Sequence, residues 1–203
     1  MSNQVSRHDR RKLETRSRIR AAAVELFGEQ GVDATKVAEI CESADVARQT
    51  FFNHFPSKAE LLRDFFRVGV DFTCAAMDSA CERGATTRER IRLFLEDVTR
   101  AAVEVGPMHR DLTAHVIRIG HESLTEAQSR RIADVFLGLV RRGLDEGDVT
   151  RRHAPEVLAE LLEGALSSLM TDWSARPRFD VTTRARQLAE LVADALEKRP
   201  DEG

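Results

Sequence analysis

The sequence predicts an all-α fold, and three observations support this class. Glycine (11 residues) and proline (5) are scarce in a chain of 203 residues, so few positions interrupt a helix. Apolar residues recur at spacings of three and four along most of the chain, which is the period of an amphipathic helix. No segment alternates apolar and polar residues as a strand does, and we find no internal repeat. We therefore expect helices from end to end.

Two helices are expected at the beginning of the chain. Residues 16–30 carry apolar side chains at helical spacing, and Gly31 follows where a left-handed residue would cap the helix. Thr35 is the expected N-cap of a short second helix, which ends near Glu42. Both segments have one apolar face and therefore require a partner to pack against.

A third and a fourth helix follow closely. Residues 43–46 have the length of a tight turn, and a third helix is expected over 47–53. Ser57 and Glu60 match the capping box that begins a fourth helix. A short helix, a four-residue turn and another short helix form the helix-turn-helix arrangement, whose second helix enters the major groove of DNA.

The third helix divides its side chains between two directions. At about 100° per residue, Arg48, Gln49 and Phe52 share one side, whereas Phe51 points to another and joins the core. In a major groove, arginine pairs with guanine, glutamine pairs with adenine, and an aromatic ring contacts the thymine methyl group. Composition alone leaves open an ordinary solvated face with one exposed phenylalanine. Side chains near the helix ends are expected to reach phosphates: Thr35, Lys36, Thr50, His54 and Lys58.

Charge is distributed unevenly along the chain. The net charge is −3, yet residues 1–20 hold seven Lys or Arg against two acidic residues. This asymmetry indicates either a local anion-binding region or a solvated arm. The chain has no apolar run of signal-peptide or membrane-spanning length, and its three cysteines are scattered. These features favour a cytoplasmic protein.

The remaining chain is expected to be helical, with breaks at Gly84, Gly106, Gly120, 147–152 and Pro177. The expected helices lie near 87–105, 108–119, 125–146, 154–175 and 181–198.

The last two expected helices are candidates for a dimer interface. The apolar surface of 154–175 is broader than one packing stripe requires, and 181–198 has apolar residues at spacings of three and four. Together they form a four-helix bundle with a second copy or pack wholly within one chain. The candidate interface residues are Leu158, Leu162, Ala165, Leu169, Leu188, Val192 and Ala195.

A small-molecule pocket is expected among the middle helices, lined by large apolar side chains and one histidine. Each of these residues is also a plain candidate for the core. The candidates are Phe94, Met108, His115, Phe136, Met170 and Trp173.

Histidine and cysteine spacing argues against a metal site and against a disulfide. His109, His115 and His121 are six residues apart, so they point about 240° away from one another in turn and do not converge on one helix. Cys74 and Cys81 lie about 10.5 Å apart along a helix, beyond disulfide reach. A single reactive cysteine, Cys41 included, remains an alternative sensor.

The run TRSRIRAAAVELFGEQGVDATKVAEICESADVARQTFFNHFPSKAELL, residues 15–62, resembles the TetR family of bacterial transcriptional regulators. The resemblance implies a homodimeric repressor that binds a palindromic operator, with a DNA-binding domain over 1–58. It also implies a helical domain over 59–203 that dimerises and holds a small effector. By position, the family's usual DNA contacts correspond to Arg48, Gln49, Thr50, Phe52, His54 and Lys58.

Three residues depart from the family's pattern. Asp45 stands in place of the usual turn glycine, and Asp tolerates left-handed geometry better than most residues. Ala47 replaces a frequent serine N-cap, at a cost of about 1 kcal/mol unless Asp45 substitutes. Phe52 replaces the usual tyrosine, so a phenolic hydrogen bond to phosphate is absent.

The sequence therefore predicts a ligand-responsive DNA-binding regulator that needs no metal or cofactor. The alternative is a redox-responsive regulator of the same fold that uses a cysteine thiol. An enzyme is not expected, because the sequence has no catalytic motif, phosphate loop or metal-ligand cluster.

Overall fold

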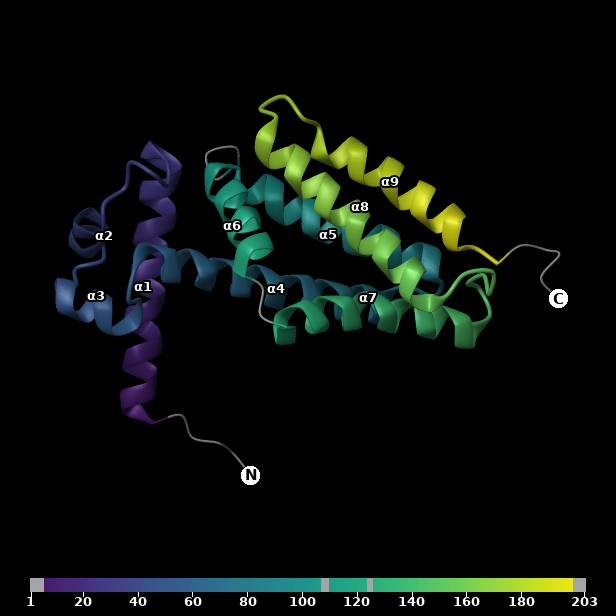
Figure 1. Ribbon diagram of the computed structural model, residues 1–203, viewed down its shortest axis with the longest axis horizontal. Coiled ribbons are helices and arrows are strands. Elements are labelled where there is room, and N and C mark those ends of the chain that lie inside the picture. The colour runs from purple at the N-terminus through teal and green to yellow at the C-terminus, as the bar shows by residue number, and fades with distance from the viewer. Residues whose placement is uncertain (1–5, 107–109, 124–125, 199–203) are drawn as a thin grey trace.

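The computed structural model describes residues 6–106, 110–123 and 126–198, and helices account for most of these ranges (Figure 1). Apart from an isolated bridge between Val149 and Glu197, the described residues contain no β-structure, which confirms the all-α class. Within these ranges every helix is too short or too polar to cross a bilayer. The helices are α1 (Arg7–Gln30), α2 (Val37–Ser43), α3 (Arg48–His54), α4 (Lys58–Arg83), α5 (Thr87–Val105), α6 (Arg110–Ser123), α7 (Glu126–Glu146), α8 (Pro155–Ala175) and α9 (Val181–Leu196).

Two predicted helix boundaries near the beginning of the chain are wrong. α1 begins at Arg7, well before residue 16, because the Ser6 hydroxyl accepts a hydrogen bond of 3.1 Å from the backbone N–H of Asp9 and caps the helix. The basic segment is therefore helical from Arg7 onward. The N-cap of α2 is Lys36, whereas the Thr35 hydroxyl donates to the Gly31 carbonyl at 2.8 Å.

Other predicted boundaries agree with the described helices to within two residues, except at Gly120. Ser57 caps α4 by accepting from the backbone N–H of Glu60 at 3.1 Å, and Gly31 ends α1 with φ +84°. α5 matches the expected range, and α8 begins one residue late. Gly120 does not break α6, which continues to Ser123, because a glycine inside a helix costs only about 1 kcal/mol.

The helices pack around two separate apolar cores. The smaller core joins α1, α2 and α3 with residues of α4 and α6, and Phe27, Phe51 and Phe55 in it are each no more than 1% exposed. The larger core joins α4, α5, α7, α8 and α9. Figure 1 shows α4 running from the α1–α3 end into the larger part, where α8 and α9 lie side by side along one edge.

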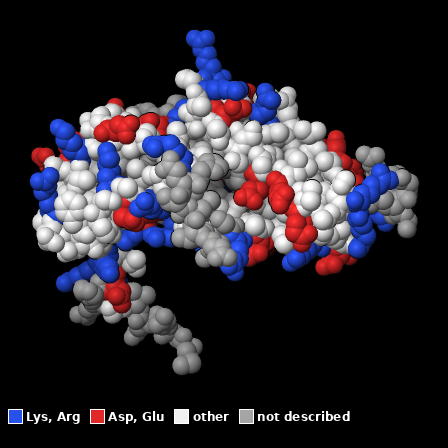
Figure 2. Space-filling model, in the orientation of Figure 1, with Lys and Arg blue, Asp and Glu red and all other residues white. Residues whose placement is uncertain are grey.

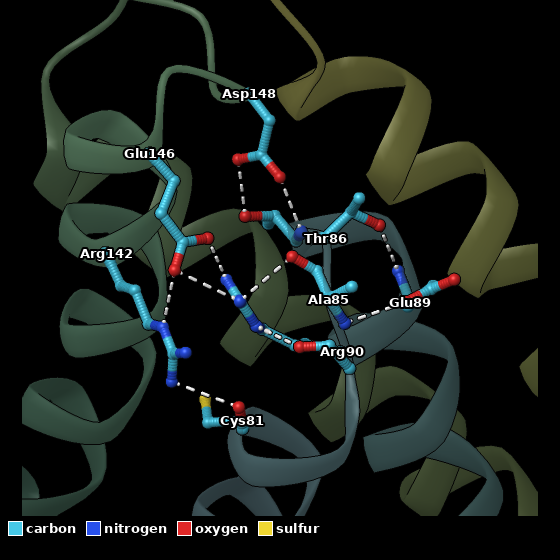
Figure 3. Close-up of polar contacts among 10 residues, drawn as sticks. Cys81, Ala85, Thr86, Glu89, Arg90, Arg142, Glu146 and Asp148 are labelled. Carbon is cyan, nitrogen blue, oxygen red and sulfur yellow. Dashed lines mark hydrogen bonds and ion pairs between the residues drawn. The ribbon is translucent and has the colours of Figure 1, made fainter.

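A buried arginine fastens the turn between α4 and α5 to the end of α7 (Figure 3). Arg90 is 1% exposed, and its guanidinium donates to the Gly84 carbonyl at 2.9 Å and to the Ala85 carbonyl at 3.1 Å. It also pairs with the Glu146 carboxylate, which accepts a second bond from Arg142 at 2.8 Å. These two arginines lower the pKa of Glu146 to about 2.

A second contact closes the same end of the molecule. The Asp148 carboxylate accepts from the backbone N–H of Thr87 at 2.7 Å and from its hydroxyl at 2.8 Å. Gly143 lies against this contact so closely that a Cβ atom there would collide with Thr87 and Val149. The beginning of α5 and the end of α7 are therefore in close contact at Gly143.

Candidate DNA-binding face and apolar cavity

The turn before α3 has the left-handed residue expected of a helix-turn-helix. Asp45 has φ +50°, which confirms that this aspartate accepts the conformation usually taken by glycine. The backbone N–H of Val46 donates to the Cys41 carbonyl at 3.0 Å and closes the turn. The N-cap of α3 is Ala47, and no side chain caps the helix, so Asp45 does not replace the missing serine.

The two neighbouring phenylalanines of α3 have different surroundings, as predicted. Phe51 is fully buried, whereas Phe52 is 42% exposed. Their rings meet edge to face at 5.4 Å between centroids, and Phe55 packs against Phe51 at 5.9 Å. The contact holds the exposed ring of Phe52 in a fixed direction beside the core.

Polar side chains surround Phe52 on the outer side of α3. Arg48, Gln49 and Asn53 are exposed, and Thr50 is half-buried. The Gln49 amide donates to the Asn53 side-chain oxygen at 3.1 Å, one helical turn away. The face thus presents one guanidinium, two linked amides and one aromatic ring.

Two of the residues expected to reach phosphate support the fold instead. Thr35 is 1% exposed, and its hydroxyl donates a hydrogen bond to the Gly31 carbonyl. The Lys58 ammonium donates to the carbonyls of Val32 at 2.8 Å and Thr35 at 3.0 Å, so it fastens the loop between α1 and α2. Lys36, by contrast, is exposed at the N-terminus of α2. The positions of these residues in the sequence do not show which of them support the fold and which is exposed to a ligand.

His54 is also poorly suited to an ionic phosphate contact. Its side chain is half-buried, and within the described residues its Nδ1 atom is buried without a hydrogen-bond partner. Burial, followed by the positive charges of Arg16 and Lys12, lowers the pKa of His54. The lowered pKa favours the neutral form of the ring.

Arg16 joins the end of α3 to α4, a role that sequence reasoning missed. Its guanidinium donates to the His54 carbonyl at 3.3 Å, lies over the Phe55 ring at 4.4 Å and pairs with Asp64 at 2.7 Å. The Asp64 side chain is 1% exposed and also faces Arg20 at 3.6 Å. The sequence offered one signal of this role: Asp64 lies between the apolar residues of the fourth helix, where a buried charge requires a partner. Figure 2 shows further Lys and Arg side chains around the α1–α3 end.

A second candidate site is a cavity of about 250 Å³ that lies between α4, α6, α7 and α8 and opens to solvent. Its walls are mainly apolar, and Phe136 and Met170 are the two predicted pocket residues that line it. The other lining residues were not predicted as part of a pocket, among them Phe66, Val70 and Val116.

Three other predicted pocket residues, Phe94, His115 and Trp173, do not line this cavity. Phe94 is buried behind Phe136, with ring centroids 5.8 Å apart, and Met108 lies outside the described residues. Trp173 borders a smaller cavity of about 170 Å³, where the Arg110 guanidinium lies 5.3 Å from its ring. His115 faces Asp33 at 3.4 Å, near the loop after α1.

Glu163 lines the cavity and was also missed. The side chain is half-buried, and among the described residues its carboxylate has no hydrogen bond and no ion pair. Burial, with a smaller effect of Glu160, raises the pKa of Glu163. A charged residue on the same helical stripe as Leu166 and Met170 was the signal in the sequence.

α4 and α6 each touch both the small core and the cavity. Leu61 and Leu62 of α4 belong to the small core, whereas Phe66 and Val70 of the same helix line the cavity. On α6, Leu112 packs in the small core and the Asp111 carboxylate accepts from the backbone N–H of Val32 at 2.7 Å. The next turn of α6 lines the cavity.

The predicted dimer interface needs correction. Four of its residues, Leu158, Leu162, Leu169 and Val192, are at most 5% exposed and pack inside the protomer, where no partner can reach them. Ala165 and Leu188 are partly buried against the same core, and Ala195 is exposed. The large apolar side chains that α8 and α9 do expose are Val157 (54%), Leu161 (43%) and Leu191 (64%).

Neither metal binding nor thiol chemistry gains support from the described residues. No group of three His, Cys, Asp or Glu among them is placed to hold a metal ion. The side chains of His109 and His121 lie outside the description. Burial raises the pKa of Cys41, Cys74 and Cys81, which disfavours the reactive thiolate form.

Comparison with known proteins agrees with the helix-turn-helix geometry. Residues 19–65 match the family of bacterial regulatory proteins of the tetR type. The chain is 24% identical over 200 residues to the transcriptional regulator AcrR of Shigella flexneri, covering 89% of this chain and 88% of that protein. It is 25% identical to the transcriptional repressor KstR of Rhodococcus jostii, covering 93% of this chain and 87% of that protein.

Solved structures share the fold over nearly the whole chain. A TetR-family regulator from Pectobacterium atrosepticum superposes with a TM-score of 0.74 at 20% identity, covering 97% of this chain and all of that chain. The repressor FadR of Thermus thermophilus was solved in complex with lauroyl-CoA. It superposes with a TM-score of 0.64 at 21% identity, covering 93% of this chain and 99% of that chain. The relatives are regulators of transcription and not enzymes. The match to the tetR-type family thus covers the helix-turn-helix, residues 19–65, and the helices that follow share the fold of a solved TetR-family regulator.

Proposed function

We propose that the protein is a homodimeric repressor that holds a palindromic operator and releases it when a small effector enters the cavity. The DNA-binding part is the segment 1–58, and 59–203 binds the effector and dimerises. Its place of action is the cytoplasm, where a bacterial operator is found.

One observation carries this proposal: the cavity is built on the two helices that also support the small core. α4 packs Leu61 in that core and lines the cavity one turn later with Phe66. α6 holds the backbone of Val32 through Asp111 and lines the cavity with Val116. An effector that changes the packing of these helices therefore changes the position of α3, since packed helices move as rigid units.

DNA reading is assigned to the exposed side of α3. Arg48, Gln49 and Phe52 project together, and their side chains suit guanine, adenine and the thymine methyl group. Lys36 is exposed at the start of α2, from where it contacts phosphate. Arg16 positions the far end of α3 from the protein side by holding the His54 carbonyl.

Dimerisation is assigned to the outer faces of α8 and α9. Val157 and Leu161 lie one turn apart on α8, as Leu191 and Ala195 do on α9, and all four are exposed in the protomer. A twofold four-helix bundle would bury them. Two α3 helices held about 34–36 Å apart fit successive major grooves, and an effector that favours another spacing shifts the dimers off DNA.

A gel shift on the DNA upstream of the protein's own gene tests the reading face. The double variant Arg48→Ala and Gln49→Ala is expected to lose sequence-specific binding, while Arg141→Ala, which removes an exposed arginine of α7, keeps it. Retained specific binding by the double variant would remove these residues from the proposed face.

Selection of bound fragments from a random DNA pool tests the dimer. The expected motif is a palindrome whose half-sites lie about one helical turn, or a multiple of it, apart. In the full protein, Leu161→Glu with Leu191→Glu is expected to yield monomers that bind the same motif weakly. Recovery of only non-palindromic, weak sequences would contradict the dimeric repressor.

A further inference from the structure

We propose that the effector is a compact apolar molecule carrying a positive charge, and that Glu163 is its counter-ion. This inference rests on the proposed function of the cavity and names the class of ligand that fits it.

The position of Glu163 supports a direct contact with a ligand. Its side chain projects from α8 on the same stripe as Leu166, Ser167 and Met170, all of which line the cavity. The carboxylate therefore shares the cavity wall with the apolar side chains that would hold the body of a ligand. Glu160, one turn earlier on α8, is exposed and does not line the cavity.

The charge of the cavity wall selects the sign of the ligand. The described lining residues of α4, α6 and α7 include no Lys, Arg, His, Asp or Glu, so Glu163 is the single ionisable residue of the wall as far as the structure describes it. It has no ion pair and no hydrogen bond among the described residues. An unpaired carboxylate in apolar surroundings is costly, and an arriving cation removes this cost, whereas an anion adds repulsion to it.

The shape and aromatic content of the cavity agree with such a ligand. Phe66 of α4 and Phe136 of α7 both line it, and aromatic rings attract cations through their π faces. The volume of about 250 Å³ lies just below the usual range of ligand pockets, roughly 300–1,000 Å³. A short alkyl or aryl group bearing one ammonium group fits these limits better than a large conjugate does.

Calorimetric titration of the full-length protein tests the inference with three probes that share an eight-carbon chain: octyltrimethylammonium, octan-1-ol and octanoate. We expect the cation to bind about tenfold more tightly than the alcohol, since a charge-assisted contact in a partly buried site has this magnitude. Octanoate is expected to bind more weakly than the alcohol, because it meets the unpaired carboxylate.

Two matched variants separate the contact from a general effect of charge. Glu163→Gln is expected to abolish the preference for the cation, whereas Glu160→Gln removes the same charge one turn away and is expected to preserve it. Circular dichroism of both variants shows whether the helices are retained. The wild-type comparison of the three probes does not depend on either variant.

The pH dependence gives a second measurement. The groups around the Glu163 carboxylate are neutral side chains from α4, α6 and α7, with the Glu160 carboxylate nearby on α8. Because its pKa is raised, Glu163 becomes protonated at a higher pH than an ordinary glutamate does. Affinity for the cation is expected to decrease through that range in the wild type and to stay constant in Glu163→Gln.

The outcomes distinguish this inference from the proposed function. Equal or tighter binding of octanoate, or no binding of the cation, overturns the inference, while operator binding in a gel shift leaves the repressor function standing. Loss of the repressor function would instead appear as absent sequence-specific DNA binding, whatever the order of the three probes.

Discussion

The two cores of the molecule are packed in different ways. In the small core, Phe51 is fully buried and touches Phe52 and Phe55 edge to face or tilted, so aromatic rings fill the space behind α3. In the larger part, α4, α6, α7 and α8 leave a cavity of about 250 Å³ with Glu163 in its wall.

This difference agrees with the proposed roles of the two parts. A DNA-reading helix must present its side chains in one fixed arrangement, and a close-packed core resists displacement. An effector site must have two arrangements that differ in free energy by only a few kcal/mol, and unfilled space makes both accessible. The following predictions test whether the small core holds α3 rigidly and whether the part that contains the cavity changes its packing when a ligand binds.

The largest effect is expected from Phe51→Ala. Removal of this buried ring leaves a void behind α3 and should lower the free energy of unfolding by about 3–5 kcal/mol. Urea denaturation measures the loss, and a gel shift should show that operator binding disappears with it. In Phe52→Ala, where the ring is exposed, stability should hardly change although DNA binding weakens. Equal destabilisation by the two variants would contradict the division between the rings.

Gly143→Ala tests the contact between the beginning of α5 and the end of α7 in the larger part of the molecule. The added methyl group would collide with Thr87 and Val149, so we expect a loss of about 1–3 kcal/mol in thermal or urea unfolding. Gly138 is the matched control, because it lies on the same helix and an added Cβ there meets no other atom within 4 Å. Gly138→Ala should raise stability slightly, since alanine favours a helix.

Asp64→Asn tests the link between the two parts. The neutral amide weakens the pair with Arg16 and should cost about 1–2 kcal/mol of stability. Its clearer result is expected in DNA binding, because Arg16 also holds the His54 carbonyl at the end of α3. The control is Asp71→Asn. Asp71 lies on α4, as Asp64 does, and forms an exposed pair with Arg131 of α7, so its loss should leave operator affinity unchanged.

Gly69→Ala tests the cavity itself. Gly69 lines the cavity within α4, and a Cβ at this position meets nothing within 4 Å. The protein should therefore become about 0.5–1 kcal/mol more stable, since glycine disfavours the helix interior. Effector affinity should fall because the added methyl group occupies ligand space. A variant with unchanged effector affinity would place the ligand elsewhere.

The smallest effect is expected from the pH dependence of Glu146. Its pKa of about 2 lies below the ordinary value of 4.5, so its contribution to stability is present above pH 4.5 and is lost as the pH falls toward 2. The difference in unfolding free energy between the wild type and Glu146→Gln should therefore shrink across this range. A constant difference would show that Arg90 and Arg142 do not act through the ionised carboxylate.

Local chemistry explains which features the sequence predicted well. A serine cap at Ser57, a left-handed glycine at Gly31 and an aspartate at the turn position 45 each act within a few residues. Their geometry therefore depends little on the rest of the fold. The division between Phe51 and Phe52 was likewise predictable, because the helical period alone separates their directions.

Features that depend on distant helices were not predictable in the same way. α8 is apolar on most of its surface, so periodicity does not say whether Leu158 or the adjacent Val157 faces inward; the structure buries Leu158. Thr35 and Lys58 have the residue types of phosphate contacts, yet neighbouring carbonyl groups use their hydrogen-bond donors. The cavity is space left unfilled by four helices, and no residue type marks such space.

The contact between Arg110 of α6 and Trp173 of α8 provides an optical signal. Trp173 is the sole tryptophan of the chain, there is no tyrosine, and the guanidinium lies 5.3 Å from the indole ring. Any displacement of α6 relative to α8 alters the surroundings of this one indole. The intrinsic emission spectrum therefore reports that displacement in real time, without a dye and without DNA, so the rate of helix movement can be measured separately from the rate of operator release.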